Sequence, residues 1–255
     1  MIDISLLLLL VAATLAGGVL KGIAGFGFGL VVTTVLIQVL PPKQAIAVMI
    51  LPVLGANVQI LASADLGAMR TCVKRFRWYV AASIVGTVLG MQFVALIPDR
   101  ILSIGIGFFA LLFVLFSQRW LEVPLKKDVV CAARRRHWGS QLGAGLLSGG
   151  VFGSANNGTL IVSYLESLDI DRETFVGLLS LVVLAATAVR LGQGFRLGLF
   201  TGDVPFSLSL FALLPTAAGV MVGSRLRKYV SEDLVRTLVL TLLTIIGVRL
   251  LYVAV

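Results

Sequence analysis

The sequence predicts an all-α polytopic membrane protein of two inverted repeats, each a broken, re-entrant glycine-rich helix segment plus three transmembrane helices. Of the 255 residues, 58% are hydrophobic and 13% are charged, about half the charged fraction of a soluble protein. Two glycine-rich stretches, Gly18–Gly29 and Gly145–Gly158, each interrupt a long apolar segment. Loops at matching places in the two halves also carry opposite charge patterns.

Apolar runs of about 20 residues, the length of one bilayer crossing, mark the elements in order. The first half has a broken segment over about 4–40 and helices near 43–64, 76–97 and 101–119. The second half has a broken segment over about 139–165 and helices near 173–193, 203–224 and 232–254. This order divides the chain into a first transmembrane repeat (1–119), a cytoplasmic basic connector (120–138) and a second transmembrane repeat (139–255).

The two breaks carry the functional prediction. Glycine lets backbones approach closely and lets a helix stop, so polar backbone can line a cavity at membrane depth. A duplicated membrane unit with an interrupted first helix is typical of a secondary transporter, whose site lies where the two breaks meet.

Four motifs recur in the same order in both halves, which indicates duplication. The pairs are Gly22-x-x-Gly25 with Gly150-x-x-Gly153, Leu66-Gly67 with Leu197-Gly198, Gly86-x-x-x-Gly90 with Gly219-x-x-x-Gly223, and Pro98-Asp99 with Ser231-Glu232. Any one pair is weak evidence of duplication. The Gly-x-x-x-Gly pair, for example, mostly marks close helix packing.

The matched loops predict the orientation of the repeats. Loop 68–77 carries four basic residues and its counterpart 199–203 carries none, whereas loop 98–100 is nearly neutral and its counterpart 225–228 carries three. Basic loops face the cytoplasm, so a reversal between counterparts indicates inverted repeats.

We therefore expect both termini outside the cytoplasm, and loops 65–76 and 120–138 inside. The alternative is that the broken segments cross the membrane like ordinary helices, which gives eight simple crossings. The inverted arrangement puts more basic residues on the cytoplasmic side than this alternative does.

The order of motifs resembles the sulfite exporter TauE/SafE family, a group of bacterial permeases that are also described as toluenesulfonate-type uptake permeases. The resemblance covers essentially the whole chain. The segments that carry it are Gly22–Gly29, Leu40–Ala45, Gly149–Gly158, Gly219–Arg227 and Gly247–Leu251.

The resemblance implies a multi-pass permease or exporter of small anions in the bacterial inner (plasma) membrane. Such anions are often sulfur-containing: sulfite, sulfonate or an organosulfur carboxylate. This chain departs from the family pattern at Ser154–Asn157, where a glycine run is common, and at Lys21. Sulfite is therefore one candidate among these anions and is not singled out as the substrate.

Lys21 is the sharpest single candidate, because it lies among apolar residues immediately before a glycine turn. A lysine inside a membrane is costly unless it is paired or lines a wet cavity, so a functional place is the default expectation. The alternative is a lysine that reaches back to the interface.

The other candidates supply side-chain donors or exposed backbone amides at the breaks. The predicted substrate-binding residues are Lys21, Gly22, Gly25, Gly27, Gly29, Asn57, Gly150, Gly153, Ser154, Asn156, Asn157, Gly158 and Arg190. The asparagines could instead end helices or cross-link them, and Arg190 could be an interfacial arginine. Half-helix N-termini after Gly29 and Gly158 would also attract an anion.

These features predict an anion transporter that works by alternating access between the two repeats. An anion channel is the alternative; an intramembrane enzyme built on Ser154 is disfavoured, because the only histidine, His137, lies in a basic loop. With one histidine and two separated cysteines there is no metal-site spacing, and no cofactor is expected. The expected partners are a small anionic substrate and the lipid bilayer, not nucleic acid, and a homodimer is left open.

Overall fold

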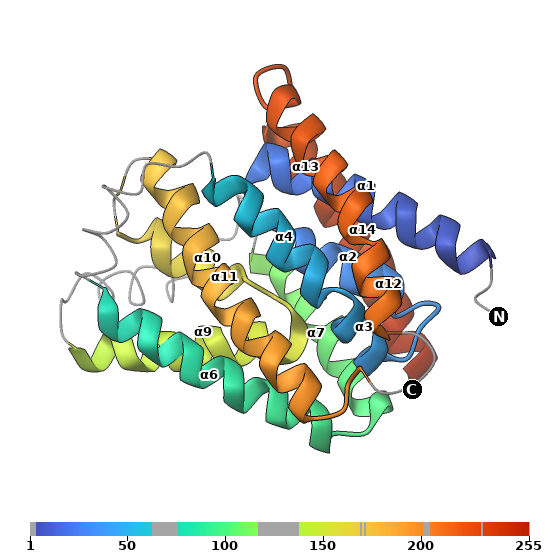
Figure 1. Cartoon of the computed structure of the whole chain (residues 1–255), viewed down its shortest axis with the longest axis horizontal. Coiled ribbons are helices and arrows are strands. Elements are labelled where there is room, and N and C mark those ends of the chain that lie inside the picture. The colour runs from blue at the N-terminus through green and yellow to red at the C-terminus, as the bar shows by residue number, and fades with distance from the viewer. Residues whose placement is uncertain are drawn as a thin grey trace.

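The computed structural model describes residues 4–62, 76–116, 138–168, 170, 172–200, 205–230 and 232–254, and every regular element in them is a helix (Figure 1). In the first half these are α1 (Ile4–Ala24), α2 (Phe28–Leu36), α3 (Pro42–Val48), α4 (Ile50–Leu61), α6 (Arg77–Leu96) and α7 (Asp99–Phe116). In the second half they are α9 (Trp138–Ala155), α10 (Thr159–Glu166), α11 (Arg172–Arg196), α12 (Pro205–Phe211), α13 (Leu213–Leu226) and α14 (Glu232–Ala254). The predicted all-helical class is confirmed.

Both predicted breaks are present. The first separates α1 from α2, with φ of 85° at Gly25 and 88° at Gly27, and the second separates α9 from α10, with φ of 53° at Asn156. A positive φ is strained for most residues, but glycine adopts it freely and asparagine tolerates it. The two sequences therefore stop their helices at these points.

Each broken segment folds back on itself. A Cβ placed on Gly17 of α1 would lie 2.3 Å from the side chain of Val32 in α2, on the far side of the break. In the second half, Tyr164 of α10 stacks on Tyr79 at 3.9 Å between ring centroids, and the Tyr79 hydroxyl lies 3.0 Å from Ser148 Oγ in α9. The short helices α2 and α10 thus run back beside the helices that precede them.

Two predicted helices are each divided into two, which the sequence analysis did not anticipate. The expected helix 43–64 appears as α3 and α4, and the expected helix 203–224 appears as α12 and α13. A proline clashes with the carbonyl four residues earlier and cannot donate to it. Pro52 lies four residues after Val48, the last residue of α3, and Pro215 lies four residues after Phe211, the last residue of α12.

The helices pair across the two halves. Figure 1 shows α6 beside α9 along one edge of the molecule and α1 near α13 at the other, and these two pairs have the closest packing in the structure. The helices α4 and α11 pack on each other, as do α7 and α14. If the halves are exchanged, α1 with α13 becomes α9 with α6, and the other two pairs map onto themselves.

Glycines make the two closest pairs possible. A Cβ on Gly86 would lie 2.3 Å from the carbonyl oxygen of Leu146, and a Cβ on Gly219 would lie 2.3 Å from that of Leu15. These distances leave no room for a side chain, so the helix backbones are in direct contact, as in membrane helix pairs with small interfacial residues.

The same contacts give a register between the halves. Gly22 packs on the carbonyl of Val220, and Gly153 packs in the same way on that of Thr87, so Gly22 corresponds to Gly153. The glycine motifs had paired Gly22 with Gly150, three residues away. In the new register the positive-φ residue Gly25 corresponds to Asn156, and the helix starts after Gly27 and Gly158 also coincide.

Among the described residues, five helical stretches are long and apolar enough to cross a membrane: Ile4–Ala24, Pro42–Leu61, Arg77–Leu96, Thr174–Arg196 and Phe206–Leu226. The second and the fifth of these each join a divided pair, α3 with α4 and α12 with α13. The outward faces of the five stretches carry large apolar side chains, for example Leu96 and Leu214, exposed by 81% and 72%. Such surfaces suit lipid rather than water. The predicted inner loops 65–76 and 120–138 lie outside the described residues, apart from Phe76 and Trp138.

Candidate functional site

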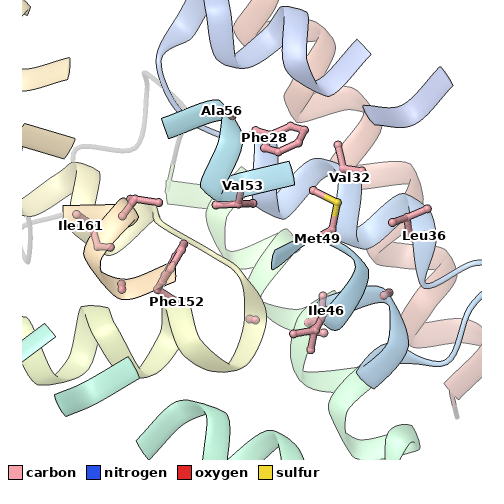
Figure 2. Packing of buried hydrophobic residues seen from close by; sticks show 14 of the residues in the cluster. Phe28, Val32, Leu36, Ile46, Met49, Val53, Ala56, Phe152 and Ile161 are labelled. Carbon is pink, nitrogen blue, oxygen red and sulfur yellow. The ribbon is translucent and has the colours of Figure 1, made fainter. Parts of the chain in front are cut away.

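A cavity of about 40 Å³ lies where the two helix breaks meet. Residues of both breaks line it, together with the starts of α2 and α10 and one face each of α4 and α11. A volume of this size is room for a few water molecules or one small anion. Figure 2 shows apolar side chains packed around the same region, among them Phe28, Val53 and Phe152, which also line the cavity.

The breaks touch each other directly. A Cβ on Gly29 at the start of α2 would lie 2.7 Å from the backbone oxygen of Asn156, so only glycine allows this approach. The side-chain amide of Asn156 donates to Thr33 Oγ1 at 3.0 Å and to the Gly29 carbonyl at 3.4 Å. One residue of the second break therefore ties it to the short helix that follows the first break.

Lys21 reaches the cavity from the end of α1. Its side chain is buried, and Nζ donates a 2.9 Å hydrogen bond to Asn57 Oδ1 on α4. The amide nitrogen of Asn57 donates to the Val53 carbonyl at 2.6 Å, which turns its oxygen toward the lysine. Lysine has three donors, and no carboxylate among the described residues pairs with it.

Arg190 lies behind the cavity wall on α11. It is fully buried, donates from Nη1 to Asn156 Oδ1, and its guanidinium carbon lies 5.1 Å from the centre of the Phe152 ring. Within the described part of the chain, Nε and Nη2 have no hydrogen-bond partner. Arg190 does not line the cavity itself, but both residues that it contacts do.

Asn157 shapes the start of α10. Its Oδ1 accepts a 3.0 Å hydrogen bond from the backbone nitrogen of Thr159, the first residue of that helix. Neither Gly27 nor Gly158, the residues that precede α2 and α10, offers a side-chain cap. The first amides of a helix lack partners within it and carry the positive end of its dipole, so two helix starts add positive potential at the cavity.

Seven of the predicted substrate-binding residues line the cavity: Lys21, Gly27, Gly29, Asn57, Asn156, Asn157 and Gly158. The other six lie around it. Gly22 and Gly153 pack helices together, Gly150 lies beside Gly86, Gly25 forms the first break, Ser154 donates to the Gly150 carbonyl at 2.9 Å, and Arg190 contacts Asn156.

The apolar part of the wall and one polar support were not among the residues predicted from the sequence. Phe28, Val53, Phe152 and Val183 line the cavity, but an apolar residue in a membrane helix carries no signal of its own. Thr33, which accepts a hydrogen bond from Asn156, could have been found, because it is a polar residue within the apolar run after the first break.

A family model described as "Sulfite exporter TauE/SafE" matches residues 9–250 of this chain. No curated protein and no solved structure matched the chain.

Proposed function

The chain belongs to the sulfite exporter TauE/SafE family, a family of membrane transporters and not of enzymes, and on that premise we propose that it carries a small sulfur-containing anion through the cavity between its helix breaks. It is a multi-pass membrane protein, and we place it in the bacterial inner membrane. The candidate substrates are sulfite, sulfonates and organosulfur carboxylates.

The observation that carries the proposal is the buried charge of Lys21. A lysine ammonium away from water is costly unless an opposite charge or a wet cavity meets it. Lys21 lines the cavity and its described partner is the neutral amide of Asn57. An anion in the cavity would supply the missing negative charge.

The helix starts strengthen the site for an anion. Phe28 and Gly29, at the first turn of α2, and Thr159, the first residue of α10, line the same cavity as Lys21. The Thr159 amide already donates to Asn157 Oδ1, so α10 would act on an anion through its dipole. Backbone amides at a helix start bind oxyanions by hydrogen bonds and by the helix dipole. Paired half-helix starts at the interface of two repeats are also how several transporters hold anionic groups.

We propose alternating access as the mechanism, with the repeat 1–119 moving against the repeat 139–255, and with the connector 120–138 on the cytoplasmic side. The pairing of α1 with α13 and of α6 with α9 supports two equivalent units. The opposite charges of the matched loops support their inversion. A cavity of about 40 Å³ lined by both breaks suits a carrier site that holds one small ion at a time.

Ligand stabilisation of the purified protein tests the proposal. A ligand that binds only the folded state raises its stability, by about 2.7 kcal/mol at one hundred times Kd. Unfolding temperatures with sulfite, thiosulfate, sulfate and methanesulfonate should therefore rise in the wild type. Lys21→Met should fold and lose this response, because it removes the cation that faces the cavity.

Two further variants make the test specific. Lys21→Arg should keep part of the response, since it keeps the charge but presents a planar fork in place of a compact ammonium. Lys43→Met is the matched control, because Lys43 donates to the Ala95 carbonyl at 3.2 Å and does not line the cavity. A normal ligand response, and normal uptake into liposomes, in Lys21→Met would contradict the proposal.

A further inference from the structure

Each half of the molecule has one buried cation near the cavity: Lys21 lines it, and Arg190 lies directly behind its wall on a helix of another kind. In the packing register, Lys21 of α1 corresponds to Phe152 of α9, since both directly precede the packed glycines Gly22 and Gly153. The position that holds a cation in the first half therefore holds an aromatic ring in the second. The guanidinium of Arg190 lies over that ring.

The helices α4 and α11 match in the same way. Asn57 Nδ2 donates to the carbonyl of Val53, and Thr187 Oγ1 donates to the carbonyl of Val183, four residues back in each case. Both valines line the cavity. Arg190 comes three residues after Thr187, about one turn further along the helix, and from there it reaches the ring that replaces the lysine.

Arg190 has unused binding capacity. Its side chain is fully buried, yet Nε and Nη2 have no hydrogen-bond partner among the described residues. Leaving buried donors of a charged group unsatisfied is costly. The polar group that Arg190 does contact, the side-chain oxygen of Asn156, belongs to a residue of the cavity wall.

We propose that Arg190 is the second cation of the substrate site and that it makes the site selective for dianions over monoanions of the same size. Asn156 holds the guanidinium one side-chain layer behind the cavity. An anionic oxygen is a stronger acceptor for arginine than an amide oxygen, so a dianion would take over this contact. Lys21 and Arg190 together would then neutralise its two charges.

Asn156 links this exchange to the fold. Its amide also donates to Thr33 Oγ1 and to the Gly29 carbonyl, so it joins α11 to the start of α2. When Arg190 turns to the substrate, Asn156 loses its cationic partner on α11. Dianion binding would thereby loosen a contact between the two halves, at the place where alternating access needs movement.

The test compares two probes of similar shape and different charge. Sulfate is a dianion, and methanesulfonate is a monoanion in which a methyl group replaces one oxygen; sulfite and thiosulfate at pH 8.5 are further dianions. Affinities are measured at constant ionic strength by thermal unfolding and calorimetry. The inference rests on the proposed function. The wild type should bind its best dianion at least about tenfold more tightly than methanesulfonate. This ratio corresponds to the low end of the free energy that one charge-assisted hydrogen bond contributes.

Arg190→Met should reduce that ratio to about one while methanesulfonate still binds, and Arg190→Lys should restore part of it. Arg249→Met is the control, since Arg249 is an exposed arginine on α14. An unchanged preference in folded Arg190→Met, or a wild type without any dianion preference, would overturn the inference. If Arg190→Met does not fold, the wild-type ratio and the Arg190→Lys ratio still decide it. Binding of none of the anions by the wild type would instead contradict the proposed function.

Discussion

At the scale of single residues, both buried cations are held by asparagine oxygens and not by carboxylates. Asn57 accepts from Lys21, and Asn156 accepts from Arg190. An amide orients a cation but does not cancel its charge. A carboxylate in either place would form a buried ion pair inside the protein, and the positive potential in the cavity would fall. Neutral acceptors therefore suit a site that must attract an anion and release it again.

Asn57→Asp tests this reasoning. The new carboxylate would lie where Oδ1 now lies, 2.9 Å from Lys21 Nζ, and would compete with the substrate for the lysine. We expect a higher unfolding temperature of the ligand-free protein, by a few degrees for a gain of about 1–3 kcal/mol, and loss of anion binding. Gln59→Glu is the control on the same helix, because Gln59 contacts the Ala217 carbonyl and does not line the cavity. Full anion binding by Asn57→Asp would show that the lysine charge is not used.

At the scale of elements, the function depends on where helices stop. Positive φ at Gly25, Gly27 and Asn156 ends α1 and α9 beside the cavity and lets two new helices begin there. The glycines within the helices have another task, since they bring α1 onto α13 and α9 onto α6. These close pairs hold the breaks of one half against the helices of the other half.

Alanine substitutions separate packing glycines from incidental ones. Gly86→Ala and Gly219→Ala would each bring a Cβ to 2.3 Å from a backbone oxygen, and forcing atoms into a packed interface costs about 1–3 kcal/mol. Both should lower the unfolding temperature by a similar amount, because the two sites correspond in the two halves. Gly143→Ala is the matched control on α9, since nothing lies within 4 Å of its Cβ position. Equal stability of all three variants would contradict the packing described here.

At the scale of the whole molecule, the pairing of helices has a two-fold pattern, and the proposed inversion gives that pattern a direction in the membrane. The charges of the matched loops predict that 65–76 and 120–138 lie inside and that both termini lie outside. The chain contains natural reporters for this arrangement, because its two cysteines, Cys72 and Cys131, lie one in each of these loops.

A membrane-impermeant maleimide should label neither cysteine in cells whose inner membrane is intact, and both after that membrane is permeabilised. Cys72→Ser and Cys131→Ser, made singly, assign the label to one loop. Asp99→Cys in a chain without the native cysteines is the positive control, because Asp99 is exposed at the start of α7 and its loop is expected outside. Labelling of Cys131 in intact cells, or a cytoplasmic C-terminus in reporter fusions, would rule out the inverted arrangement.

Much of the candidate site could be predicted from the sequence, because its polar residues stand out against an apolar background. Lys21, Asn57, Asn156 and Asn157 are costly in a membrane helix without a partner, and the structure brings all four to one cavity. Phe152 and Val183 could not be found in this way. Their importance comes from which side of a helix they occupy, and that depends on the neighbouring helices.

The helical membrane class, the two breaks and the family follow from the amino-acid sequence, because composition, glycine and proline act locally on the chain. Which residues meet depends on how the helices pack. Backbone contacts set the register that makes Lys21 the counterpart of Phe152, and only the packing of α11 places Arg190 on that ring and on Asn156. Such contacts join residues far apart in the chain, so no local pattern encodes them.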